Sequence, residues 1–60
     1  MELTITINLD NAAFADYAGQ EIKRILIKEG ELIEDMSKPM KYGEIIRDIN
    51  GNTCGDISID

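Results

Sequence analysis

The chain has 60 residues, a net charge of −6, one cysteine and no histidine. This length predicts one domain, residues 1–60, near the lower limit at which a hydrophobic core alone stabilises a fold. One cysteine and no histidine exclude an intramolecular disulfide and a Cys/His zinc site, so we expect extra burial to come from oligomerisation, in the first place as a homodimer.

Charge and hydropathy also limit which partners and which cellular compartment we expect for the protein. The excess of acidic residues argues against binding to the phosphate backbone of a nucleic acid, which needs clustered Lys and Arg. The first ten residues lack the basic and long apolar regions of a signal peptide, and no segment reaches the ~20 apolar residues that span a bilayer. The sequence therefore predicts a soluble intracellular protein with no membrane partner.

The first predicted element is a strand over residues 2–9. Apolar and polar side chains alternate strictly there, as they do in a strand with one buried face. The connector of residues 10–19 carries turn residues and one helical turn at residues 12–14, with Phe14 expected in the core. The apolar face of the strand comprises Leu3, Ile5, Ile7 and Leu9, and the polar face comprises Thr4, Thr6 and Asn8.

Residues 18–36 show the period of an amphipathic helix. Gly30 costs about 1 kcal/mol relative to alanine in such a helix, which the rest of the pattern outweighs. Glu29 falls near the middle of the apolar stripe, where a carboxylate is costly unless it is paired or lies at the edge of the core. Ile27 points away from the stripe, towards solvent or a partner. The stripe comprises Ile22, Ile25, Leu26, Leu32, Ile33 and Met36.

A loop is predicted over residues 37–43, in which Pro39 ends the helix and Gly43 permits a tight re-entry into the next strand. Two strands follow at residues 44–48 and 52–59, and a hairpin turn joins them.

Two hairpin registers are compatible with the turn residues. A two-residue turn at Asn50 and Gly51 pairs Ile49 with Asn52. A three-residue loop, with a type I turn opened by Asp48 and with Gly51 in the left-handed region, pairs Asp48 with Asn52.

The apolar residues of the hairpin favour the second register. It sets Ile46 opposite Cys54, so that two apolar side chains share a face. Gly55 then marks a bulge or kink that shifts Ile57 and Ile59 onto that same face.

These elements predict an α+β fold in the order β-α-β-β. One helix packs on one face of a three-stranded, antiparallel or mixed sheet that ends in the C-terminal β-hairpin. The other face of the sheet stays open. We expect the dimer contact on this open face or at a sheet edge, with Thr4, Thr6 and Ile45 as candidate contact residues.

No arrangement of residues points to catalysis, because Cys54 and the serines lack a histidine base. We therefore predict a protein that is not an enzyme and has no cofactor or metal. The run Asp48-x-Asn50-x-Asn52 imitates the start of a calcium loop, but Thr53 stands where that loop requires glycine. Ile59 stands where the loop requires a bidentate glutamate. Hydrogen-bonded turn residues explain the run better, and we predict no tight calcium site.

Four acidic residues lie within seven positions near the end of the predicted helix. A solvated helix face is the usual meaning of such a run. The sharper hypothesis is an acidic patch that binds a basic groove of another molecule, although the basic residues one or two turns earlier dilute its field. The candidate partner-binding residues are Ile27, Glu29, Glu31, Glu34 and Asp35.

Three segments, TITINLDNAAF, GQEIKRIL and RDINGNTCG, resemble a family of short proteins encoded by bacteriophages and prophages. Members of this family usually have no assigned function. Glu29 and Gly30 depart from the family's pattern, which has an apolar residue at the first position and alanine or a polar residue at the second. The resemblance implies a phage-encoded protein that acts in the cytoplasm of the bacterial host.

Small accessory phage proteins often act by binding a host protein. The resemblance therefore implies a non-catalytic interaction protein, for example an inhibitor of CRISPR or of another anti-phage defence system. Two alternatives stay open. One is a nucleic-acid-associated regulator that uses the hairpin or the open sheet face, and the other is a passive structural or assembly module of the phage.

Overall fold

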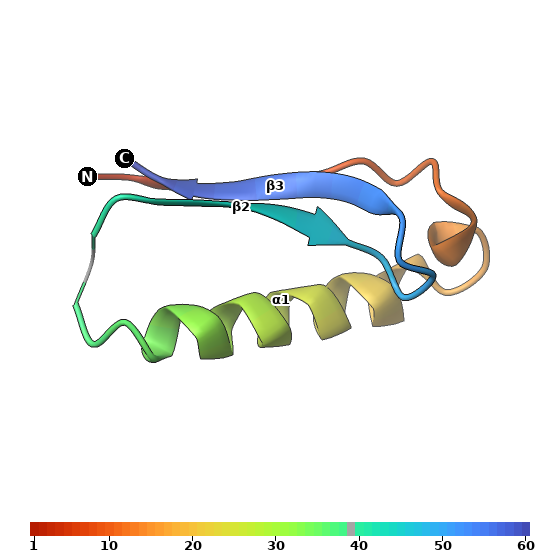
Figure 1. Ribbon diagram of the computed structural model, residues 1–60. Coiled ribbons are helices and arrows are strands. Elements are labelled where there is room, and N and C mark those ends of the chain that lie inside the picture. Colours follow the sequence, from red (N-terminus) through yellow and green to blue (C-terminus); the bar gives the residue numbers. More distant parts are fainter. Residues whose placement is uncertain (39) are drawn as a thin grey trace.

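The computed structural model describes residues 1–38 and 40–60 and has two layers, a sheet and one long helix (Figure 1). The elements in chain order are β1 (Leu3–Ile7), the short 3₁₀ helix η1 (Ala12–Phe14), α1 (Ala18–Glu34), β2 (Tyr42–Arg47) and β3 (Thr53–Ile59). The predicted α+β class and the β-α-β-β order are confirmed. The predicted end of the helix at Pro39 falls outside the described residues.

The sheet is antiparallel throughout and has the strand order β1-β3-β2. β3 is therefore the central strand, and β1 and β2 form the two edges. The two chain ends lie side by side (Figure 1), where Glu2 and Asp60 exchange backbone hydrogen bonds of 2.7 and 3.0 Å. The slab measures 35 × 17 × 16 Å.

The predicted three-residue hairpin loop is confirmed. The Asp48 N–H donates to the Asn52 carbonyl at 2.8 Å, and the Gly51 N–H donates to the Asp48 carbonyl at 2.9 Å. Gly51 has a φ of 85°, a left-handed conformation that glycine adopts without steric cost.

One detail of the predicted register is wrong. Arg47 pairs with Thr53, but Ile46 pairs with Gly55, so Cys54 has no opposite residue and is the extra residue of a β-bulge. The bulge changes which side chains of β3 face the core, the effect that the sequence predicts for a bulge or kink at Gly55. Cys54 therefore lies on the same buried face as Ile57 and Ile59.

Several element boundaries differ from the predicted ones. β1 is shorter than residues 2–9, and β2 begins at Tyr42, so Gly43 lies within a strand and not in a loop. α1 ends at Glu34, before the predicted residue 36. The helix stops there because Ser37 adopts a left-handed φ of 68°, and its N–H donates to the Glu34 carbonyl only three residues back.

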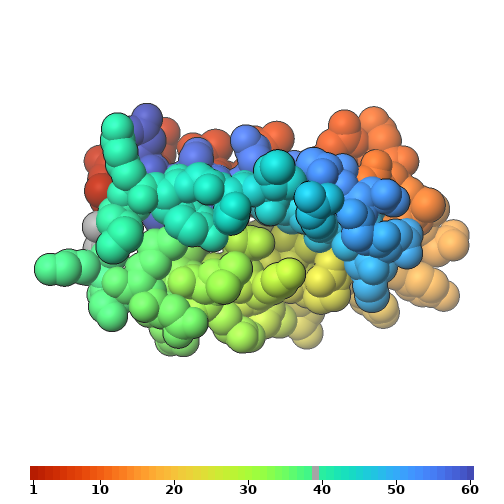
Figure 2. Space-filling view, viewed as in Figure 1, coloured from red at the N-terminus to blue at the C-terminus, as the bar shows by residue number. Residues whose placement is uncertain are grey.

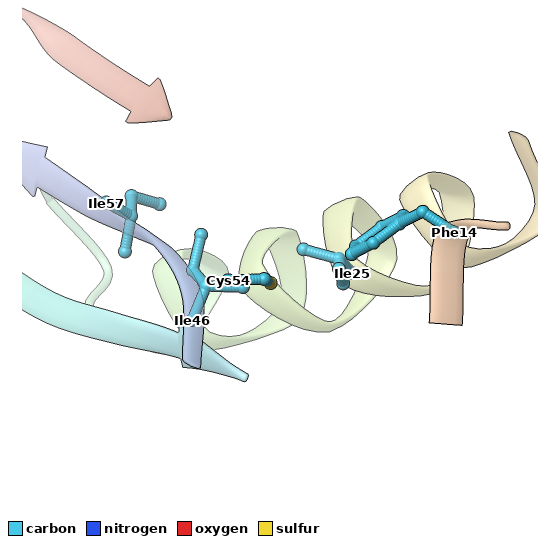
Figure 3. Packing of buried hydrophobic residues seen from close by; sticks show 5 residues of the cluster. All are labelled: Phe14, Ile25, Ile46, Cys54 and Ile57. Atoms are coloured by element: carbon cyan, nitrogen blue, oxygen red, sulfur yellow. The ribbon is translucent and has the colours of Figure 1, made fainter. Parts of the chain in front are cut away.

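The core lies between α1 and the sheet and is small. Figure 3 shows its buried cluster, to which α1, η1 and the two strands of the hairpin each contribute. Leu26 and Leu32 of the predicted stripe are 45% and 43% exposed, because the helix turns them to the margins of the contact with the sheet. The cluster comprises Phe14, Ile25, Ile46, Cys54 and Ile57.

Candidate interaction surfaces

A group of polar side chains holds the hairpin turn onto the helix. We call Asn11, Glu21, Arg24 and Asp48 the hairpin clamp. Arg24 donates two hydrogen bonds to the Glu21 carboxylate, from Nε to Oε1 at 2.7 Å and from Nη2 to Oε2 at 2.9 Å. The backbone N–H of Ile49 in the hairpin loop donates to the same Oε2 at 2.8 Å. Helix and hairpin are thereby joined through one buried carboxylate.

Asp48 organises the loop itself. Its Oδ1 accepts the backbone N–H groups of Asn50 and Asn52 at 2.9 and 3.0 Å, and its Oδ2 accepts the side-chain amide of Asn11 at 2.9 Å. These contacts confirm that Asp48 acts as a turn residue, as its position before the Asn-Gly pair indicated. In the described residues no group of three or more His, Cys, Asp or Glu side chains is placed to hold a metal ion.

The two clamp carboxylates are held in their ionised form. The hydrogen bonds from Arg24 lower the pKa of Glu21 against the opposing effect of burial, and the Ile49 N–H lowers it further. Burial opposes ionisation of Asp48, but the N–H donors of Asn52, Asn11 and Asn50 hold the pKa of that carboxyl below its ordinary value. Sequence reasoning missed Glu21 and Arg24. Their i, i+3 spacing was the available signal, but it does not identify Ile49 as the third partner.

The five predicted partner-binding residues do not form one surface. Ile27 is 51% exposed, and Glu31, Glu34 and Asp35 are exposed near it. Glu29 is only 6% exposed, because it lies on the side of α1 that faces the sheet. We call Ile27, Glu31, Glu34 and Asp35 the outer helix surface. Glu29 therefore lies apart from the other three acids of the predicted four-residue acidic patch.

The acidic side chains of the outer helix surface lie at the end of α1 where negative charge is unfavourable. Glu31 and Glu34 lie in the last turn of α1, and Asp35 caps it, while no basic residue occupies that turn. The C-terminal end of a helix carries partial negative charge, so an acid there costs a few tenths of a kcal/mol. Packing within the chain gives no compensation, since these side chains are exposed.

The three predicted dimer-contact residues do share one face of the sheet. Thr4, Thr6 and Ile45 are exposed on the side away from α1, and Ile45 is 57% exposed. Asp56 of β3 pairs with Thr6 on one side and with Ile45 on the other, so Thr6, Asp56 and Ile45 form a row across the sheet. No segment of residues 1–38 or 40–60 covers this face, and its role in a dimer stays a prediction.

A groove of about 360 Å³ runs between α1 and the edge strand β2. Figure 2 looks onto this side of the molecule, with the atoms of β2 above those of α1. Ile25 and Ile46 are buried at its floor, and Lys28 and Glu44 are exposed at its rim. Glu29 also lines the groove, and its Oε2 is buried without a hydrogen-bond partner among the described residues.

Two acidic side chains, Glu29 and Glu44, and two basic ones, Lys28 and Arg47, line this groove. Burial raises the pKa of the Tyr42 hydroxyl, and the nearby charges of Glu29 and Glu44 raise it further. A buried carboxylate oxygen without a donor is costly, since it has lost its hydration and gained nothing in return. The groove is therefore suited to a cationic hydrogen-bond donor.

A second groove, of about 580 Å³, lies at the end of the molecule that holds the chain termini. Its lining is mostly apolar and includes Leu3, Ile33 and Ile59.

The one thiol of the chain belongs to Cys54 in the core. Cys54 is buried, and burial raises the pKa of its thiol. An unionised buried thiol is a core residue and a poor nucleophile.

No family model, curated protein or solved structure matches this chain. The resemblance to short phage proteins thus stays a prediction from the quoted segments. Within the described residues, no helix is long and apolar enough to cross a bilayer.

Proposed function

We propose that this protein is a small phage-encoded accessory protein that acts without catalysis, by binding another protein in the cytoplasm of the bacterial host. The outer helix surface carries the proposal. It combines a half-exposed isoleucine with three acids that oppose the helix dipole and whose side chains form no ion pair with the other described residues. Residues that cost stability and remain exposed are explained most simply by a contact outside the chain.

The partner's chemistry follows from this surface. Ile27 supplies the apolar centre of a contact, and Glu31, Glu34 and Asp35 surround it on the C-terminal side. A partner with an apolar pocket rimmed by Lys or Arg fits this arrangement, and the net charge of −6 would speed its encounter with such a site. A nucleic-acid-binding groove of a host defence protein has that basic character, which supports a role as an inhibitor of CRISPR or of another anti-phage system.

The test is a charge reversal with a matched control. The outer-surface variant carries Glu31→Lys and Glu34→Lys, and the control carries Glu2→Lys and Asp16→Lys, which change the net charge equally at exposed positions elsewhere. Each tagged protein is expressed in bacteria that carry a defence system, and both phage plating and co-purified proteins are measured. Wild type and control should raise plating and retain one stoichiometric host protein, whereas the outer-surface variant should do neither.

Two results would contradict the proposal. One is equal capture and equal plating for the two double variants, which would take the contact away from the outer helix surface. The other is a shift of duplex DNA or RNA by the wild type in a low-salt gel, which would favour the nucleic-acid-associated alternative.

A further inference from the structure

We propose that a second copy of this chain docks on the groove between α1 and β2, with β2 pairing antiparallel to the β2 strand of that copy. In this arrangement Lys28 of the partner subunit enters the groove and donates to the buried Oε2 of Glu29. The two contacts that carry the inference, at Ile45 and at Glu29, lie outside the outer helix surface.

Three features of the β2 edge support strand pairing. β2 is a six-residue edge strand, so in the part of the chain that the structure describes its outer backbone groups have no neighbouring strand. The strand has no proline and no lysine, the residues that commonly block edge pairing. Ile45 at its centre is 57% exposed, and Leu32 at the rim of the same groove is 43% exposed. A second copy would bury both.

The register follows from side-chain direction and charge. In an antiparallel pair, opposite residues lie on the same face of the sheet. Centring the two-fold axis on Glu44 would oppose two like charges, which is destabilising. Centring it on Ile45 instead packs two isoleucines against each other and sets each Glu44 opposite Ile46 of the partner subunit.

The same axis makes the charges of the two helices complementary. The first part of α1 is basic, with Lys23, Arg24 and Lys28, whereas the part from Glu29 onward is acidic. A two-fold axis perpendicular to the sheet places the two helices antiparallel, so the basic part of each faces the acidic part of the other. Lys28 lines the groove beside Glu29, but adjacent residues of a helix do not face each other, and the buried Oε2 of Glu29 has no partner among the described residues; within one chain Lys28 does not reach it. Lys28 of a second copy can.

A second copy would also add buried surface to a molecule whose own core is small. The buried apolar cluster of one chain comprises five residues, and domains of this length are marginal without added burial. No disulfide supplies it, since the single cysteine is free and buried.

The test begins with the mass in solution, measured by sedimentation equilibrium from micromolar to near-millimolar protein. We expect twice the chain mass of 6.7 kDa for the wild type. Ile45→Lys places two lysines against each other at the axis and should give the mass of a single chain. Thr6→Lys is the matched control, since it makes the same charge change on the same open face but at the far edge strand. It should leave the dimer intact.

The Lys28–Glu29 contact is tested by mixing two charge-reversed variants. Lys28→Glu and Glu29→Lys should each self-associate about tenfold more weakly than wild type, while the mixture should form a heterodimer, because each repulsion is removed in the mixed pair. Circular dichroism checks that both variants are folded. If Glu29→Lys does not fold, Glu29→Gln replaces it. Glu29→Gln should also self-associate about tenfold more weakly than wild type.

Several results would overturn the inference. A single-chain mass at every concentration excludes the second copy and leaves the groove to a basic strand of another protein. Loss of the dimer in Thr6→Lys would move the interface to the open sheet face. A dimer unaffected by either charge reversal would exclude the contact with Glu29.

Discussion

Gly55 is the position where a single methyl group has the largest expected effect on the fold. It lies beside the bulge on the central strand, opposite Ile7 of β1. A Cβ built there overlaps the carbonyl oxygen of Thr6 and comes within 2.9 Å of the Thr6 carbonyl carbon. The backbone of β1 therefore approaches β3 more closely than any side chain at this position would allow.

We predict that Gly55→Ala lowers the free energy of unfolding by about 1–3 kcal/mol, because β1 must move away from β3. Gly30→Ala is the control. Nothing lies within 4 Å of a Cβ at Gly30, so alanine there should raise stability by about 1 kcal/mol through helix propensity alone. Urea unfolding followed by circular dichroism measures both. Equal midpoints for Gly55→Ala and wild type would show that β1 does not pack as described.

At the scale of elements, the hairpin is positioned by its clamp more than by its turn. The loop closes through Gly51 and Asp48, but its attachment to α1 depends on Glu21, which accepts hydrogen bonds from both Arg24 and the Ile49 N–H. Protonation of Glu21 removes the charge on which these contacts depend. The clamp is therefore sensitive to acid.

We predict a loss of stability in acid that the clamp carboxyls explain. Both carboxyls have a lower pKa in the folded chain than their ordinary values of 4.5 for Glu21 and 3.8 for Asp48. The unfolded chain then binds more protons, so the stabilisation is complete above about pH 5 and is lost as pH falls through the folded pKa values. Thermal unfolding between pH 7 and pH 2 measures the slope. The variant Glu21→Gln with Asp48→Asn should be less stable at pH 7 and show a slope about two protons smaller. An unchanged slope in that variant would assign the acid sensitivity to other carboxyls.

At the scale of the whole molecule, stability rests on very few buried side chains. Ile25 of α1 is 1% exposed, and Ile46 and Ile57 meet the helix from the sheet (Figure 3). A domain of this length has only a few kcal/mol of net stability. The free-energy cost of one large cavity in the core is comparable to that total stability.

We predict that Ile25→Ala leaves the chain largely unfolded at room temperature, since such a truncation costs about 2–5 kcal/mol. Ile25→Val removes one methylene and should cost about 0.5–1.5 kcal/mol, leaving a folded chain with a lower melting temperature. Proton NMR dispersion distinguishes the two states. A well-folded Ile25→Ala variant would mean that stability comes from a source outside this cluster.

The amino-acid sequence was sufficient to predict the kind and order of the elements. Strict alternation in residues 2–9, the helical period after Ala18 and the Asp48 to Gly51 turn each depend on neighbours a few residues apart, which a single sequence displays. It also placed Glu29 in the apolar stripe. The remaining features depend on three-dimensional contacts: the central place of β3, the bulge at Cys54, the bond from Ile49 to Glu21, and the groove into which Glu29 faces. Except for the bulge, which lies within the hairpin, they join different elements, as the bond between Ile49 and Glu21 does across 28 residues. Local spacing carries no record of which elements meet.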